Sequence, residues 1–330
     1  MIYLIYIEKV YRFVTERSNT MGILPMDIDI LPPCDDRIFK LILTAPEAKP
    51  ALLSLIPAII HRPVTDVIIR NNEIPPGDVD EKAERFDINC KTEDGTQIDI
   101  EMQASRIEEP DGGHENLIAK SIYYLCDLHS SQTSKGRPYH ELAQSYQVTF
   151  CGYTIFPHCE DFINSFSMRH DKDNQLLTRA INTMFVELSK LSEILKKPIS
   201  EMTDLEKWSV FLRYAENPDH REVVNKVIES KEGLAVAGEL LMSVSKDERE
   251  RAVFRSRKMF QTDMESNRVQ IQRNIAAALN EGIQQGMQRG MTAGKITIAQ
   301  SMLLNNEPLG KIILYTNLTP EEIESLRTEQ

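Results

Sequence analysis

Two short segments on either side of Glu93-Asp94-Gly95 restrict the possible folds of this chain more than any other part of the sequence. Residues 85–92 and 96–103 each alternate apolar with polar side chains, which is the pattern of a β-strand. A three-residue loop with Gly95 in the left-handed conformation forms a type I turn followed by a G1 bulge. The sequence therefore predicts a β-hairpin in which Thr92 lies opposite Thr96.

This register places two carboxylates directly opposite each other, Asp87 on the first strand and Glu101 on the second. Gln103 follows on the same face, opposite Arg85. Paired residues have Cβ atoms about 5 Å apart, and two carboxylates at that separation repel each other. Mg²⁺ (or Mn²⁺) relieves the repulsion, because such ions prefer carboxylate oxygens together with water and phosphate. The pair therefore predicts a metal site.

The metal-site prediction depends on the turn, and two alternatives remain open. A two-residue turn at Asp94-Gly95 would shift the register by one residue and separate the acids onto opposite faces. Acids that alternate with apolar residues also occur on solvated hairpin faces that have no chemical role. In the bulged register, the opposite face is expected to point into the core, and it carries Phe86, Ile88, Cys90, Ile98, Ile100 and Met102.

The order of predicted elements describes a mixed α/β core. Capping boxes mark three helix starts, at residues 44–47, 203–206 and 319–322. The expected elements of the core are a helix that begins near residue 35, a helix at 46–60, strands at 64–70, 85–92 and 96–103, a helix at 115–131, and strands at 147–156 and 183–188.

The composition is that of an ordinary soluble globular protein, with 41% apolar and 27% charged residues. A net charge of −12 argues against a protein that covers nucleic acid with a broad basic surface, but it permits an acidic, metal-binding pocket with a local basic strip. The five cysteines form no C-x-x-C pair, which indicates reduced thiols in a cytoplasmic protein. No apolar run reaches the ~20 residues that a membrane-spanning helix needs.

Several short motifs follow one another along the chain, namely Asp36-x-x-Phe39-Lys40, Lys82-x4-Asp87, Asp94-Gly95 and Ile100-Glu101-Met102-Gln103. Tyr123-Tyr124, Glu187-Leu188-x-Lys190 and a glycine array continue the series. In order and spacing it resembles the recombination-promoting nuclease / transposase family of PD-(D/E)xK enzymes over about residues 30–330. The resemblance implies a restriction-endonuclease-like core with a helical C-terminal region, and Mg²⁺-dependent cleavage of DNA in recombination or mobile-element biology.

The resemblance also implies the roles of individual residues. Asp87 and Glu101 would hold the metal, and Gln103 stands where related enzymes have lysine; its amide can hydrogen-bond water or phosphate but carries no charge. Asp36 is a candidate metal ligand and equally a candidate helix N-cap. Lys82 and Lys120 are candidates for the missing cation, and Lys40 and Lys120 for phosphate contacts. The alternative function is that of a catalytically weak or inactive descendant that binds DNA or protein.

The chain is expected to divide into an N-terminal extension (1–29, with Met21 as an alternative start), a nuclease-like core (30–195), a helical region (196–270) and a C-terminal region (271–330). The last contains Gly282, Gly286, Gly290 and Gly294 in a polar helix. Glycines at this spacing lie along one stripe and permit close approach of a partner helix. The 278–300 helix is therefore a candidate for homo-oligomerisation, and a mobile connector is the alternative.

Overall fold

The computed structural model describes residues 23–70, 87–104, 114–136 and 138–328. The chain forms two compact units, Met1–Ala252 and Val253–Gln330. The predicted domain boundaries inside the first unit stay predictions.

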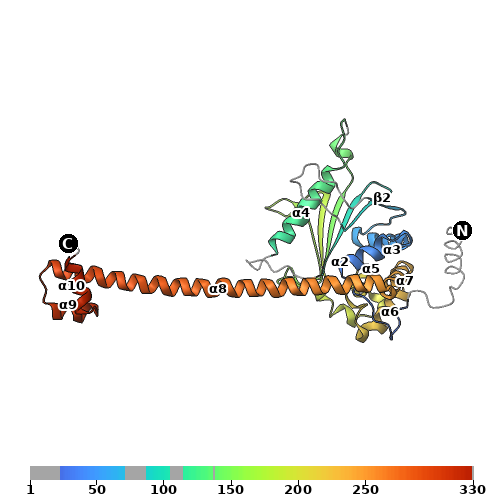
Figure 1. Cartoon of the computed structure of the whole chain (residues 1–330). Helices are drawn as coiled ribbons and strands as arrows, with labels where there is room; N and C mark the ends of the chain where they lie inside the picture. The colour runs from blue at the N-terminus through green and yellow to red at the C-terminus, as the bar shows by residue number, and fades with distance from the viewer. Residues whose placement is uncertain (1–22, 71–86, 105–113, 137, 329–330) are drawn as a thin grey trace. The chain divides into compact units, whose positions relative to one another are not determined.

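A six-stranded mixed sheet lies at the centre of the first unit (Figure 1). The strand order is β1-β2-β3-β4-β6-β5. The first three strands are antiparallel neighbours, β4 runs parallel to both β3 and β6, and β5 pairs antiparallel with β6. The strands are β1 (Val67–Ile69), β2 (Ile88–Thr92), β3 (Gln97–Gln103), β4 (Ser145–Cys151), β5 (Ile163–Arg169) and β6 (Leu176–Glu187).

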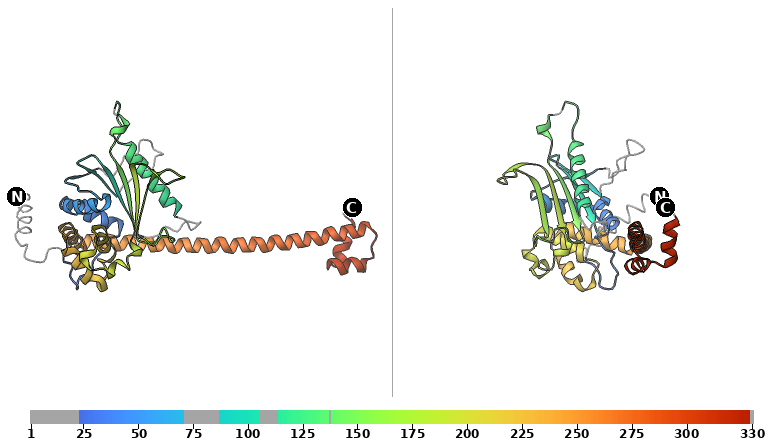
Figure 2. Two further views of the ribbon diagram at one scale, coloured as in Figure 1. Left: turned by 180° about the vertical axis from the view of Figure 1, so that it is seen from behind. Right: turned by 90° about the vertical axis from the view of Figure 1, so that its left-hand side faces the viewer.

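Helices cover both faces of this sheet (Figure 2). Helix α2 (Asp36–Thr44) packs Phe39 against Phe150, with ring centroids 6.1 Å apart. Helix α4 (Glu115–Ser130) places the Ser121 hydroxyl 3.3 Å from that of Thr149. Because Thr149 and Phe150 are consecutive strand residues, these two helices lie on opposite faces. The predicted mixed α/β fold is confirmed.

The hairpin register is confirmed. Ile88 pairs with Ile100 and Cys90 with Ile98, as the bulged turn requires. Gly95 has φ = 89°, and its amide donates to the Thr92 carbonyl at 3.0 Å. The two-residue turn is therefore excluded, and the register that places Asp87 opposite Glu101 holds.

Both faces of the hairpin are buried. Ile88, Cys90, Ile98 and Ile100 are fully buried and Met102 is 3% exposed, which confirms the predicted core face; Phe86 and Arg85 lie outside the described residues. The solvated alternative for the acidic face is wrong, because Asp99 is fully buried and Glu101 only 6% exposed. The reason is that α4 lies over this face.

The second helix begins differently from the prediction. Thr44 forms no capping box, since its hydroxyl donates to the Lys40 carbonyl and the 3₁₀ turn Pro46–Ala48 precedes α3 (Lys49–Ile60). The other two capping boxes are confirmed, at Thr203 with Glu206 and at Thr319 with Glu322.

Two of the predicted strands have different bounds in the structure, and a third strand was not predicted. β4 ends at Cys151 rather than near 156, because Gly152 donates its N–H to the Gln103 carbonyl and approaches Ala104 closely. A Cβ at position 152 would lie 2.1 Å from the Ala104 oxygen. β6 is longer than the expected 183–188, and β5 was not predicted.

Three further helices complete the first unit: α5 (Asp204–Tyr214), α6 (Arg221–Glu229) and α7 (Glu232–Lys246). They extend the apolar core beneath α3. The indole N–H of Trp208 on α5 donates to the Ser54 hydroxyl on α3 at 3.2 Å, and both residues are buried. Gly233 on α7 also packs at Ser54, where a Cβ would lie 2.2 Å from the serine Cβ.

The second unit consists of the greater part of α8 (Glu248–Leu304), which is 57 residues long, with α9 (Leu309–Thr316) and α10 (Pro320–Thr328). The two short helices pack on the end of α8 through the buried residues Ala299, Ile312, Leu318, Ile323 and Leu326. The four glycines of the ladder lie within α8, where a Cβ at any of them would meet no atom within 4 Å.

Among the described residues, no single helix is long and apolar enough to cross a membrane. The segments Asp36–Thr44 and Pro46–Ile60 are long and apolar enough only when they are taken together, and they are bent by 73° relative to each other.

Gly95→Val tests the turn. A β-branched residue is strongly disfavoured at positive φ, whereas the nearest atom to a Cβ here, 3.5 Å away on Ala143, leaves ordinary contact distance. We expect a loss of about 1–3 kcal/mol, as for other strained backbone positions, measured as a lower melting temperature and lower guanidinium midpoint.

Gly95→Asn is the matched control, because asparagine tolerates positive φ better than valine does. It should lose clearly less stability. Equal melting temperatures for the valine variant and the wild type would show that the turn does not depend on glycine.

Candidate active site

The centre of the site is the pair formed by Asp87 and Glu101. Asp87 lies one residue before β2, and Glu101 lies on β3. The Met102 N–H donates to Asp87 Oδ2 at 2.9 Å, and the Asp87 N–H donates to Glu101 Oε1 at 3.1 Å. Each carboxylate thus accepts a hydrogen bond from the backbone of the facing segment, which holds the two acids on the same side of the hairpin.

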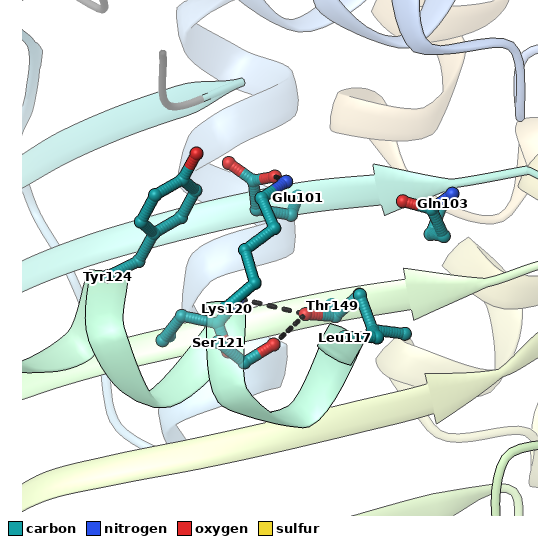
Figure 3. Close-up of a pocket in the computed structure, with 8 residues that line it drawn as sticks. Glu101, Gln103, Leu117, Lys120, Ser121, Tyr124 and Thr149 are labelled. Carbon is teal, nitrogen blue, oxygen red and sulfur yellow. Dashed lines mark hydrogen bonds and ion pairs between the residues drawn. The ribbon is translucent and has the colours of Figure 1, made fainter. Parts of the chain in front are cut away.

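Lys120 reaches this pair from α4 (Figure 3). Its ammonium lies 2.8 Å from Glu101 Oε2 and 4.9 Å from the centre of the Tyr124 ring. Burial opposes the positive charge, but the charge of Glu101 and the hydrogen bond to it outweigh burial, and the pKa of Lys120 is raised. Lys120 is therefore protonated and positively charged beside the paired acids.

Gln103 lies two residues beyond Glu101 on the same strand face. It lines a pocket between α4 and the sheet together with Glu101, Leu117, Lys120, Ser121, Tyr124, Gln147 and Thr149. Figure 3 shows Gln103 further along β3 from Glu101, and Lys120 extending toward Glu101 from α4. The structure therefore brings together three of the predicted residues, Glu101, Gln103 and Lys120, around one pocket.

Asp99 is a residue of this face that the sequence did not single out. It is fully buried, and neither carboxylate oxygen has a hydrogen-bond partner among the described residues. Burial raises its pKa well above the usual value, and the charges of Glu101 and Asp87 raise it further. Its position two residues before Glu101 was the available signal, but only coverage by α4 makes it a buried acid.

Burial also raises the pKa of Asp87, from 3.8 to about 6, with the charge of Glu101 as the second cause. The Met102 N–H and the charges of Lys120 and Lys40 act in the opposite direction. Lys40, on α2, therefore lies close enough to Asp87 to affect it electrostatically. Lys82 lies outside the described residues.

The arrangement fits a divalent cation held by two carboxylates. Asp87 and Glu101 lie opposite each other, and each carboxylate accepts a hydrogen bond from the backbone of the facing segment. No group of three or more histidine, cysteine or acidic residues in the described part of the chain could hold a metal together. Mg²⁺ commonly uses only one or two carboxylates and completes its shell with water and phosphate.

Asp36 is the first residue of α2 and is exposed. The N-cap of that helix is Asp35, whose carboxylate accepts from the Arg37 and Ile38 N–H groups, so Asp36 is not the cap. A role for Asp36 as metal ligand stays a prediction.

Comparison with known families adds a second, independent observation. Residues 33–270 match the model of the PD-(D/E)XK nuclease family transposase. The chain belongs to this family. The match covers most of the chain and includes Asp87, Glu101, Gln103 and Lys120, while the glycine ladder of α8 lies beyond it. No curated protein and no solved structure matches the chain.

Membership of the PD-(D/E)XK nuclease family agrees with the fold. A mixed six-stranded sheet with flanking helices forms the core, and further helices follow toward the C-terminus. The resemblance seen in the sequence is thereby confirmed, and the family supports a nuclease- or transposase-like function for the chain.

The pKa of Asp87 gives a test that needs no substrate. The folded-state pKa of about 6 lies above the usual value of 3.8 for an aspartate, so ionising Asp87 destabilises the metal-free protein at neutral pH, and this penalty disappears as pH falls from 6 toward 4. We expect Asp87→Asn to raise the melting temperature at pH 7.5 by a few degrees, at about 2–4 °C per kcal/mol, and to make little difference near pH 4.

Calcium should raise the melting temperature of the wild type at pH 7.5, less at pH 5.5, where the proton competes, and not in Asp87→Asn. Asp171→Asn, at an exposed acid, is the control. If both variants respond alike to pH and calcium, Asp87 is not the metal-binding group.

Proposed function

We propose that this protein is a metal-dependent DNA endonuclease that hydrolyses phosphodiester bonds at the hairpin formed by β2 and β3. The observation that carries the proposal is the fixed pair of Asp87 and Glu101 with the Lys120 ammonium 2.8 Å from Glu101. Family membership over residues 33–270 supports a nuclease. We further propose Mg²⁺ or Mn²⁺ as the cofactor and DNA as the substrate.

The residues of the pocket have distinct proposed roles. Asp87 and Glu101 would bind the metal, which when bound lowers the pKa of a water molecule and neutralises charge on the phosphate. Gln103 would position that water or a phosphate oxygen through its amide. Lys120 would supply the positive charge that glutamine at position 103 cannot provide, because its ammonium already lies at the metal-binding pair.

Two further predicted site residues, Lys40 and Asp36, do not line the pocket, and Lys82 lies outside the described residues. Lys40 acts electrostatically on Asp87 and is proposed to contact phosphate. Lys82 and Asp36 remain candidates on the basis of the sequence motif. A cytoplasmic location is proposed because all five cysteines are unpaired.

A binding function without catalysis is the second candidate, and Gln103 in place of lysine favours it. The two functions differ in metal-dependent cleavage. The partner in the binding function is DNA or another protein.

Supercoiled plasmid incubated with and without Mg²⁺ distinguishes these functions. We expect nicking by the wild type only with the metal, and at least a 100-fold loss in Asp87→Ala and Glu101→Ala, on the order of the loss from other groups that stabilise charge in a transition state. Glu193→Ala, at a 75% exposed carboxylate, is the matched control. Full activity in either site variant would remove this pair from consideration, and no cleavage by the wild type with Mg²⁺ or Mn²⁺ would favour the binding function.

We also propose that a second copy of the chain binds along the 278–300 helix. The glycine ladder is accompanied by large exposed side chains at the same four-residue spacing, including Ile283 (51% exposed), Met287 (65%) and Met291 (61%). Glycine costs up to ~1 kcal/mol per helix position. Close approach of a partner backbone would offset this cost.

The double variant Gly286→Leu with Gly290→Leu should weaken association by holding the backbones apart, while leucine raises helicity. Analytical ultracentrifugation and circular dichroism measure the two effects. Gln284→Ala with Gln288→Ala raises helicity away from the glycines and should leave association unchanged. A wild type that is monomeric at all concentrations would leave the ladder as a connector.

A further inference from the structure

The hairpin formed by β5 and β6 extends beyond the rest of the sheet (Figure 2, right). β4 pairs with β6 only over Ile181–Glu187, whereas Leu176 and Thr178 pair with β5 alone. We call residues 167–180 the ribbon. Its tip is ordered by backbone hydrogen bonds between His170 and both Gln175 and Asn174, at 2.8 and 2.9 Å. The ribbon is therefore a defined, projecting surface.

Three cations on the ribbon face solvent without a carboxylate partner. Arg169, Lys172 and Arg179 are exposed, and no described acid lies within salt-bridge distance of any of them. Arg169 donates instead to the Asn174 carbonyl at 3.0 Å, which holds its side chain at the tip. Of the two acids at the tip, Asp173 accepts from His170 and from the Gln175 N–H, and Asp171 is exposed.

Elsewhere on the first unit, exposed lysines are commonly paired with acids. The Lys49 ammonium lies 2.5 Å from Asp66. Lys196 and Lys226 each lie 2.6 Å from a glutamate three or four residues earlier in the chain. In a protein with a net charge of −12, the ribbon carries three cations against two acids, Asp171 and Asp173. Cations without a carboxylate partner are the groups that phosphate binding requires.

The ribbon is also placed at a definite distance from the proposed site. Strand pairing sets Glu101 beside Thr149, and Thr149 beside Phe185. Arg179 lies six residues before Phe185 on β6, and the strand end at Leu176 lies nine residues before it. At about 3.4 Å per residue, Arg179 and Leu176 lie about 20 and 31 Å from Phe185 along β6. Glu101 lies two strands away from Phe185 across the sheet. One turn of B-DNA spans about 34 Å, so a single duplex is long enough to contact both places.

We propose that the ribbon binds the phosphate backbone of duplex DNA within about one helical turn of the cleavage site. This proposal rests on the proposed nuclease function, and it names a surface on which the protein holds its DNA substrate. A two-stranded ribbon is narrow enough to lie against a DNA groove. Contacts from arginine and lysine to phosphate fix the position of the duplex without reading its sequence.

The test measures DNA binding by fluorescence anisotropy with a 30-base-pair duplex in EDTA, which prevents cleavage. Each phosphate contact contributes about 0.9 to the slope of log affinity against log salt concentration. Arg169→Ala, Lys172→Ala and Arg179→Ala combined should therefore reduce the slope by about 2.7. Arg169→Lys with Arg179→Lys keeps the charges and should keep the slope.

The matched control combines Lys49→Ala, Lys196→Ala and Lys226→Ala, which removes the same net charge from paired positions and should leave the slope unchanged. Melting temperatures identify any variant that fails to fold. If the wild type binds and cuts DNA while the ribbon and control triple variants have equal slopes, the ribbon proposal is wrong and the nuclease proposal stands. If the wild type neither binds nor cuts DNA, both are wrong.

Discussion

The candidate active site depends on the left-handed conformation of one residue, Gly95. Its φ of 89° closes a three-residue turn, and that turn sets which residues of β2 and β3 lie opposite each other. Since side chains alternate between faces, a shift of one residue would send Glu101 to the other side of the sheet. The pairing of Asp87 with Glu101 therefore follows from local backbone geometry.

Burying the acids under α4 makes their charged forms less favourable in the folded protein. Burial and mutual repulsion raise the pKa of Asp87 and of Asp99, so the metal-free protein holds charge there unfavourably. Lys120 offsets part of this from across the pocket. A buried, pre-arranged pair of acids with one cation is disposed to take up a further positive ion, because that ion removes the repulsion without any movement of the strands.

The sequence predicted what depends on neighbours along the chain. The turn at Gly95, the register, the apolar face and two capping boxes all follow from local patterns. The family motifs predicted Asp87, Glu101 and Gln103 as site residues, and Lys120 was one of two candidates for the cation. The burial of Asp99 was not predicted, because the positions of the strands and helices along the chain do not tell which face of the sheet α4 covers. The end of β4 depends on the contact of Gly152 with Ala104, and β5 lacks the continuous apolar pattern of a central strand since it lies at an edge.

The lysine at this site belongs to α4 and not to the strand that carries the acids. The paired acids and the lysine can therefore change independently in descent. A relative that lost the lysine of α4 would still contain every residue of the strand motif. A relative with lysine at the position of Gln103 would not need the lysine on α4. On the proposed roles, the residue at the Lys120 position on α4 belongs to the site as much as the residues of the strand motif do.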